Sequence, residues 1–416
     1  MTAARNPDSW LTARRLVAHA GVLAICLWSI YLWSLATPGL RDRNGNLKGT
    51  DFLHFYVLGS LAAGHRGADL YDMNAQDAVV TRRVPAAKGI RYLPLYPPQV
   101  SLFFTPFARL SYVRALALWW TFSVVVYGVC CFSIWRACPN LRDYRSVVLI
   151  AALAFPGFFH LIAWGQTSAV ALGCFTLMWF QLRSGRNFLA GIALGCLILK
   201  PQLGVAAAVI FISLGSWKIV AGAVVSAAAQ LATAVLFYGI APFRQWMFEL
   251  THLGSVLPWL EPRPYQTYSL RTFWSMLIAW PHIANALWFV STIAFLGITI
   301  ALWKSGPRVP LAVRYPALLM TTVLVAPHLT VYDLVILAPA FLLLADWMAG
   351  QPGQARPRSL GTLLYLVYTL PLLAPLVRWT HVQYAVIAMG ATICLIYAKS
   401  REMAGVENQL HAAEVR

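Results

Sequence analysis

Apolar runs long enough to cross a lipid bilayer recur along this sequence from Leu16 to Ala398. An α-helix needs about 20 apolar residues to cross a hydrocarbon core of about 30 Å. Of the 416 residues, 59% are hydrophobic and 11% are charged, whereas soluble domains have roughly 45–50% and about 25%. The sequence therefore excludes a water-soluble globular protein and predicts an all-α polytopic integral membrane protein.

The apolar runs predict about 12 transmembrane helices. They lie at Leu16–Ala36 and at about 115–135, 146–164, 167–183, 188–200, 203–216, 218–238, 283–303, 312–326, 333–348, 360–377 and 382–398. Lys and Arg gather in alternate connections, as at Arg183 and Arg186, which predicts that both chain ends lie in the cytoplasm. The net charge of +18 is then explained by topology and anionic lipids rather than by nucleic acid. We predict one integral membrane domain over residues 1–398 and a cytoplasmic tail over 399–416.

Two long segments, 37–110 and 239–282, are predicted to lie at the outer membrane face and to form the functional site. Asp51–Gly64 is apolar but too short to span, so it predicts a helix in the interface. Tyr92–Leu110 carries four prolines and predicts a second interfacial or re-entrant segment. None of the 14 acidic residues lies in the middle of a predicted span. Ion-coupled transporters usually place acids there, so this pattern favours a site at the outer face.

Asp51 is the strongest candidate for a catalytic residue. On a helix, Asp51 and His54 share one face because they are three residues apart. A carboxylate among interfacial aromatic residues is partly desolvated, which raises its pKa and suits a general base. The alternative is that Asp51 merely caps the interfacial helix.

Four groups of residues, in this order along the chain, resemble the motifs of glycosyltransferase family 87. They are Asp51-Phe52 with Tyr56, Gly59 and Leu70-Tyr71-Asp72; Tyr96-Pro97-Pro98; Gly165-Gln166 with Leu199-Lys200-Pro201; and Pro327-His328 with Tyr332-Asp333. The resemblance implies the GT-C membrane fold, with interfacial helices on the outer face. That family includes mannosyltransferases that use polyprenyl-phosphate mannose, and an Asp in the first outer loop is the usual base of the fold. Asp51 is the position that matches it.

A polyprenyl-phosphate donor implies further roles. The leaving phosphate needs cations or hydrogen-bond donors, and we expect Lys200, His328 and Arg271 to provide them. Lys200 has the alternative of extending to the interface, and His328 that of a structural helix-end residue. Asp333 orders His328 or caps the next helix. The residues expected to contact substrate are His54, Tyr92, Tyr96, Gln166, Trp259 and Asp333.

The function predicted from these residues is a membrane hexosyltransferase that inverts the anomeric centre. It moves a hexose, for which the family resemblance suggests mannose, from a polyprenyl-phosphate donor to a lipid or glycan acceptor at the outer face of a bacterial-type plasma membrane. No metal and no cofactor are expected, because the sequence has neither a DxD motif nor paired histidines. The alternatives are a transporter or flippase of lipid-linked sugars and a non-catalytic membrane scaffold.

Overall fold

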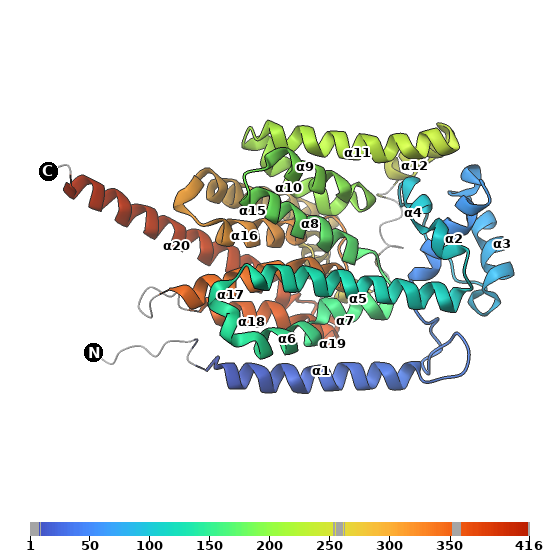
Figure 1. Ribbon diagram of the computed structural model, residues 1–416, viewed down its shortest axis with the longest axis horizontal. Helices are drawn as coiled ribbons and strands as arrows, with labels where there is room; N and C mark the ends of the chain where they lie inside the picture. Colours follow the sequence, from blue (N-terminus) through green and yellow to red (C-terminus); the bar gives the residue numbers. More distant parts are fainter. Residues whose placement is uncertain are drawn as a thin grey trace.

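The computed structural model describes residues 8, 10–252, 254, 261, 263–351 and 359–414, the last twelve of these as backbone alone. In this part of the chain the elements are helices and no strand forms, although two isolated bridges pair Arg41 with Leu47 and Thr267 with Thr330. Both chain ends lie at one end of the molecule, and the segment with α2 (Phe52–Ala63), α3 (Met73–Arg83) and α4 (Gln99–Ala108) lies at the other (Figure 1).

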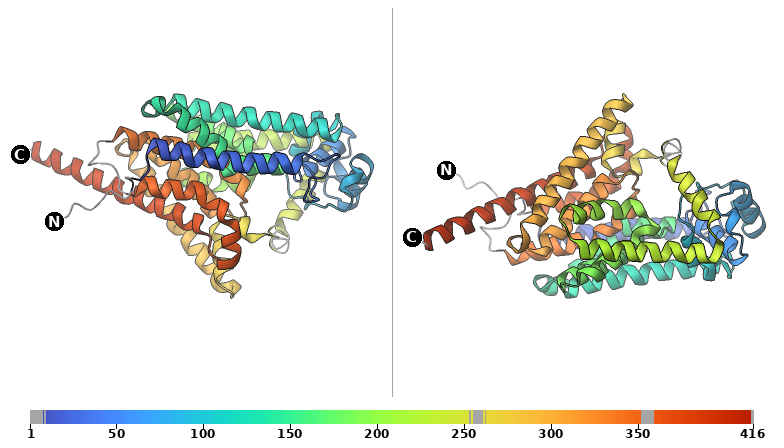
Figure 2. Two further views of the ribbon diagram at one scale, coloured as in Figure 1. Left: turned by 90° about the horizontal axis from the view of Figure 1, so that it is seen from below. Right: turned by 90° about the horizontal axis from the view of Figure 1, so that it is seen from above.

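Six described helical segments are long and apolar enough to cross a membrane. They are α1 (Ala13–Leu35), α5 (Tyr112–Arg136), α11 (Trp217–Tyr238), α15 (Pro281–Lys304), the run Val331–Gly350 formed by η7 (Val331–Leu337) and α17 (Ala338–Gly350), and the run Leu360–Thr380 formed by α18 (Leu360–Thr369), η8 (Leu370–Leu373) and α19 (Ala374–Thr380). A seventh span results if η3 (Pro139–Tyr144) with α6 (Arg145–Ala154) and α7 (Pro156–Trp164), bent by 41°, count as one. Figure 2 shows α1, α5 and α11 running along the length of the molecule.

The predicted count of 12 transmembrane helices is not confirmed, although every predicted span contains helix. The helices at the other predicted spans are α8 (Ser168–Arg183), α9 (Asn187–Gly195) with η4 (Cys196–Leu199), α10 (Pro201–Ser213), α16 (Leu311–Val325) and α20 (Tyr384–Glu414). The 16 residues of α8 rise about 24 Å, less than a hydrocarbon core of about 30 Å. Proline explains two of the breaks, because Pro156 begins α7 and Pro201 begins α10.

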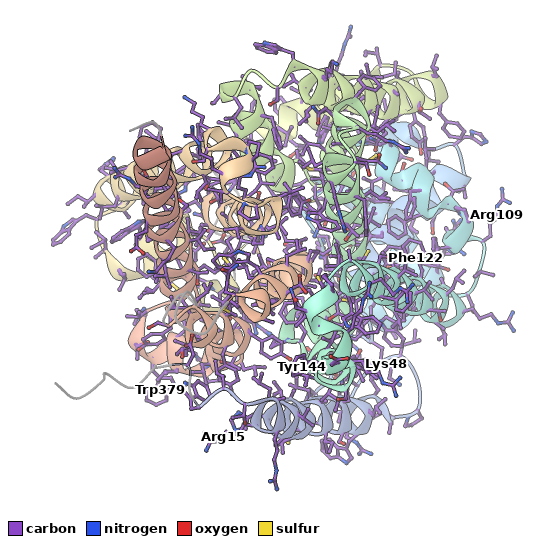
Figure 3. The ribbon with its side chains drawn as sticks, turned by 60° about the vertical axis from the view of Figure 1, so that its left-hand side comes forward. Arg15, Lys48, Arg109, Phe122, Tyr144 and Trp379 are labelled. Carbon is purple, nitrogen blue, oxygen red and sulfur yellow. The ribbon has the colours of Figure 1, made fainter. Side chains whose placement is uncertain are left out.

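The outward faces of the long helices carry large apolar side chains. Ile25 of α1, Val129 of α5 and Val290 of α15 are each more than half exposed, and Trp379 stands 85% exposed on the outer surface (Figure 3). Apolar surface of this extent in a soluble protein marks a binding site or an aggregation liability. Lipid is the environment that fits it, so the protein is a multi-pass membrane protein.

Two buried clusters of side chains hold the site in place. One joins α2 and α4 to α5 through stacked rings such as Phe52 on Trp119, with centroids 6.1 Å apart. The other surrounds α16 and η7, and all seven residues of η7 are buried. Further helices, among them α12 (Ala241–Thr251) and α14 (Leu270–Leu277), and the short turns η1 (Gly67–Asp69), η2 (Pro85–Ala87), η5 (Pro264–Gln266) and η6 (Gly306–Arg308), connect these parts. Segment 37–110 and the described residues of segment 239–282 therefore fold into helices and turns that rest on the bundle.

The predicted orientation leads to a labelling result. Lys88 lies in the segment with α2–α4 and Ser184 in the turn after α8, and both residues are exposed. In a cysteine-free background, we expect an impermeant thiol reagent added outside intact cells to label Lys88→Cys but not Ser184→Cys. Permeabilised cells, in which both positions react, provide the control. Labelling of Ser184→Cys alone in intact cells would reverse the orientation and place the candidate site in the cytoplasm.

Candidate active site

Asp51 begins helix α2 but does not cap it with its side chain. Its backbone N–H donates to the carbonyl of Trp164 over 2.9 Å, which ties the start of α2 to the end of α7. Its carboxylate Oδ2 accepts a hydrogen bond from Nε2 of Gln166 over 2.6 Å. A capping carboxylate would instead bind a backbone N–H of the first helical turn. The side-chain contacts thus do not support a capping role for Asp51.

The turn after α7 brings Gln166 to Asp51. Gly165 ends the helix with φ +70°, and a Cβ atom there would lie 2.8 Å from the Cβ of Phe52. Glycine is therefore required both for the left-handed backbone and for the close approach of the two segments. Nε1 of Trp119 donates to the Gly165 carbonyl over 3.0 Å and fixes the turn from the side of α5.

The amide of Gln166 is oriented by its neighbours. Its Oε1 accepts from the backbone N–H of Thr167 over 3.2 Å and from the hydroxyl of Tyr96 over 3.4 Å. Because the oxygen is occupied in this way, the NH₂ group faces the carboxylate of Asp51. In the structure the Gln166 side chain binds Asp51 and Tyr96, and its expected contact with a sugar hydroxyl stays a prediction.

Burial raises the pKa of Asp51 from its ordinary value to about 6. The hydrogen bond from Gln166 and the charge of Lys200 lower it, while the charge of Asp333 raises it. A carboxylate with a pKa near 6 is mostly ionised at neutral pH and is a stronger base than an ordinary aspartate. The environment thus suits Asp51 to accept a proton.

His54, Tyr92 and Tyr96 surround the same end of α2. The ring of His54 lies 5.3 Å from that of Tyr92 and 5.7 Å from that of Tyr96, between centroids. The Tyr92 hydroxyl donates to the carbonyl of Thr50, next to Asp51. Among the described residues neither ring nitrogen of His54 has a hydrogen-bond partner, and burial lowers its pKa to about 4. A neutral imidazole with one free donor and one free acceptor suits a hydroxyl group.

His54 and Tyr92 also line a small surface recess. Its other walls come from α3 and the following loop, with residues Gln76, Asp77 and Arg91 among them. Arg91 and Asp77 form an ion pair there with an N–O distance of 2.5 Å. The structure thus brings His54, Tyr92, Tyr96 and Asp51 to one polar, aromatic-walled location.

Lys200 and Asp333 form a buried ion pair beside this group. Nζ of Lys200 lies 2.8 Å from Oδ1 of Asp333, and each side chain is 2% exposed. Ser168 donates from Oγ to the same carboxylate oxygen over 2.5 Å and accepts from Lys200 over 3.0 Å. The Lys200 ammonium also lies 4.9 Å from the ring centroid of Tyr332. Lys200 therefore does not extend to the interface; it is held in the protein interior.

Helix α9, in the segment that precedes Lys200, packs closely on α11. Cβ atoms added at Gly191 and Gly222 would lie 2.0 Å and 2.2 Å from carbonyl oxygens of the facing helix, so small residues let the backbones touch.

Asp333 caps η7, because its carboxylate accepts a hydrogen bond from the backbone N–H of Thr330 over 3.4 Å. Of the two roles considered for Asp333, its contacts agree with capping, because the hydrogen bond of His328 goes to Glu261 instead.

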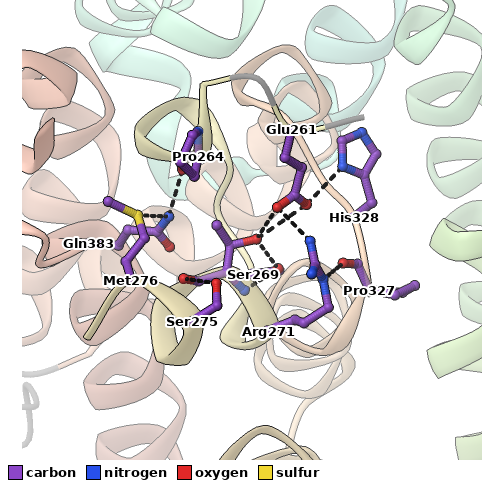
Figure 4. A network of polar contacts seen from close by, with 10 residues as sticks. Glu261, Pro264, Ser269, Arg271, Ser275, Met276, Pro327, His328 and Gln383 are labelled. Atoms are coloured by element: carbon purple, nitrogen blue, oxygen red, sulfur yellow. Dashed lines mark hydrogen bonds and ion pairs between the residues drawn. The ribbon is translucent and has the colours of Figure 1, made fainter. Parts of the chain in front are cut away.

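Arg271 and His328 meet at a second carboxylate, that of Glu261 (Figure 4). Nη2 of Arg271 lies 2.5 Å from Oε2, and Nδ1 of His328 lies 2.9 Å from Oε1. The three cations expected at the donor phosphate are thus divided, because Lys200 pairs with Asp333. The loop from Pro327 to Asp333 joins the two groups, and its length limits the Cα atoms of His328 and Asp333 to a separation of about 18 Å at most.

Glu261 did not emerge from the sequence motifs. It is one of two acidic residues in segment 239–282. An acidic residue is therefore rare in this segment, and the position of Glu261 close in sequence to Arg263 and Arg271 was the available signal. Burial alone would raise the pKa of Glu261, but the hydrogen bonds and charges of His328 and Arg271 outweigh burial and lower it. Trp259, the remaining substrate candidate, lies outside the described residues.

Comparison with known families now assigns the chain. The sequence profile of glycosyltransferase family 87 matches residues 95–327, more than half of its length. The chain belongs to glycosyltransferase family 87. The match to family 87 includes Tyr96, Gln166, Lys200 and Arg271, and it begins after Asp51 and ends just before His328. Neither a curated protein nor a solved structure matches the chain. Membership of family 87, together with the apolar helices, makes the protein a membrane glycosyltransferase.

Proposed function

We propose that this protein transfers a hexose from a polyprenyl-phosphate donor to a hydroxyl group of a lipid or glycan acceptor. The observation that carries the proposal is the carboxylate of Asp51, which is held by Gln166 rather than by its own helix and has a pKa of about 6. In family 87, whose chemistry is glycosyl transfer, a carboxylate of this kind fits the role of general base.

The reaction follows a single displacement. The acceptor oxygen attacks the anomeric carbon while Asp51 takes the hydroxyl proton. The bond from that carbon to the phosphate oxygen breaks, and its electron pair leaves with the polyprenyl phosphate. Asp333 is engaged by Lys200, Ser168 and Thr330, which leaves Asp51 as the available carboxylate of the site. One carboxylate fits inversion, since retention through a covalent intermediate usually needs two close ones.

The donor phosphate is assigned to the cationic groups near the loop from Pro327 to Asp333. Arg271 and His328, with side chains 15% and 20% exposed, contact it directly. Lys200 is buried, so it acts on the phosphate electrostatically, through the protein interior and without direct contact. These groups supply the counter-charge of a monophosphate without a metal ion. Tyr92, Tyr96 and His54 contact the sugar or the acceptor, as their position beside Asp51 supports.

Helices α2 and α4, beside Asp51, lie at the end of the molecule opposite the start of α1 (Figure 1). We assign that end to the outer face of a bacterial-type plasma membrane, where a lipid-linked sugar presents its head group. The enzyme would then act in the synthesis of a glycolipid or a related glycan, with mannose as the first hexose to test. A transporter or flippase of lipid-linked sugars is the alternative, and membership of family 87 favours transfer over transport.

The donor class can be tested with purified protein in detergent and with labelled sugar on different carriers. We expect polyprenyl-phosphate mannose, or another hexose on that carrier, to support transfer to an acceptor lipid mixture. GDP- or UDP-linked sugars should not support transfer, and a metal chelator should leave the rate nearly unchanged. Efficient transfer from a nucleotide sugar without a lipid carrier would contradict the proposed donor and the roles of Arg271 and His328.

A further inference from the structure

The carboxylate of Glu261 occupies a site that is built for an anion. Helix α14 begins beside it, and Ser269 caps that helix by accepting from the backbone N–H of Thr272 over 3.3 Å. Arg271 and Thr272 lie in the first helical turn, where the helix dipole favours negative charge. The side chain of Glu261 is 7% exposed, so an acidic residue from the preceding loop fills the site almost completely.

Three donors converge on this one carboxylate. Arg271 binds Oε2 and His328 binds Oε1, at 2.5 Å and 2.9 Å. The Thr272 hydroxyl lies 3.1 Å from Oε2 and 3.3 Å from Oε1. A guanidinium group, an imidazole and a hydroxyl are also the groups that bind phosphate oxygens. The same donor set therefore suits a phosphate group with its separate anionic oxygens.

Arg271 and Thr272 also have contacts that do not involve Glu261. Nε of Arg271 donates to the carbonyl of Pro327 over 2.5 Å, and the hydroxyls of Thr272 and Ser269 lie 3.2 Å apart (Figure 4). The backbone N–H of Tyr268 donates to the Leu329 carbonyl over 2.8 Å, which fastens the two chain segments together. Departure of the Glu261 side chain would thus leave Arg271 and Thr272 in place for another anion, on a segment that is fastened to the loop carrying His328.

We propose that Glu261 is an internal ligand that occupies the donor-phosphate site of the resting enzyme and is displaced when the donor binds. This inference rests on the proposed function, because it assigns the phosphate to Arg271 and His328. The carboxylate competes with the phosphate for the same groups. The free energy of donor binding is therefore the difference between the binding free energies of the phosphate and of the Glu261 carboxylate at this site. After transfer, the return of Glu261 helps to expel the polyprenyl phosphate product.

The test measures binding of polyprenyl phosphate, without any sugar, to the purified full-length protein. Glu261→Gln removes the competing charge, and we expect about tenfold tighter binding. Glu261→Asp keeps the charge but shortens the reach, and a smaller gain in the same direction is expected. Glu249→Gln changes the other acid of the segment and should leave binding unchanged. Adding Arg271→Met to Glu261→Gln should abolish the gain, because the phosphate then lacks its main partner.

The outcomes distinguish the internal-ligand role of Glu261 from the proposed phosphate site itself. Weaker or unchanged binding by both Glu261→Gln and Glu261→Asp would overturn the inference, because Glu261 would then be an anchor that holds Arg271 and His328. Thermal unfolding of each variant shows whether a loss of binding reflects a loss of fold. Binding is measured without sugar transfer, so a gain in Glu261→Gln supports the internal ligand even if the transferred sugar or the acceptor is assigned wrongly. If neither Arg271→Met nor His328→Gln weakened the binding of polyprenyl phosphate, the proposed phosphate site would be refuted.

Discussion

Replacement of Asp51 by Asn should lower the rate of sugar transfer at least about a hundredfold while donor binding and membrane insertion stay nearly normal. Asn has the same size and its side-chain oxygen can still accept the hydrogen bond from Gln166, but it cannot take the proton of the acceptor hydroxyl. General-base catalysis is worth typically 10²–10⁴-fold, which corresponds to roughly 3–5 kcal/mol of activation free energy. The measurement is the initial rate of transfer at saturating donor.

Asp72→Asn is the matched control for this variant. Asp72 is a true helix cap, since its carboxylate accepts from the backbone N–H groups of Asn74 and Ala75 at 2.8 Å and 3.3 Å. Asn caps about as well as Asp, so transfer should continue at the parental rate.

The parent enzyme should also lose kcat/KM about tenfold per pH unit below about pH 6, where Asp51 becomes protonated, and Asp51→Asn should lack this dependence. Transfer by Asp51→Asn within about threefold of the parent would exclude Asp51 as the base.

Replacement of Lys200 by Met should destabilise the fold in addition to slowing transfer. The carboxylate of Asp333 would remain 2% exposed without its ammonium partner, and loss of one partner of a buried ion pair costs about 3–5 kcal/mol. The expected result is a lower denaturant midpoint in detergent. Transfer should fall as well, because the charge that Lys200 contributes at the phosphate is lost in both the ground state and the transition state.

Two further variants show whether the ion pair is the cause. Lys200→Met combined with Asp333→Asn removes both charges and should recover much of the lost stability. Arg66→Met breaks the exposed pair with Asp69, whose side chains are 43% and 33% exposed, and should change stability by about 1 kcal/mol or less. A Lys200→Met protein as stable as the parent, or a double variant as unstable as the single one, would contradict the buried pair.

The helices were largely predictable because each depends on a local pattern. Apolar runs indicated where helices form, and the short apolar stretch Asp51–Gly64 indicated helix α2. Tyr92–Leu110, predicted as an interfacial or re-entrant segment, contains helix α4. Helix α3 was not predicted, because Met73–Arg83 is polar and its start depends on the cap by Asp72. The number of spans was harder to predict, since helices such as α8 and α10 form close to the predicted positions but, with 16 and 13 residues, are shorter than a typical membrane span.

Local sequence patterns could not predict which residues of the site contact one another. Motif matching selected Asp51, Gln166, Lys200 and Asp333, but which of them would touch depends on contacts between residues 115 or more positions apart. In the structure Gln166 binds Asp51 and Lys200 pairs with Asp333, and neither contact was predicted from the sequence. Glu261 had no motif at all, and its importance appears once the fold places it against His328, 67 residues away.

The most direct test of the account follows a labelled sugar in proteoliposomes. The purified protein is reconstituted with a polyprenyl-phosphate hexose, labelled in the sugar, and with acceptor lipids. We predict that label moves to the acceptor and that one polyprenyl phosphate is released for each sugar transferred, with no movement when the acceptor is left out. Label that stays on its carrier and merely appears in the opposite leaflet would show transport and would contradict a glycosyltransferase site at Asp51.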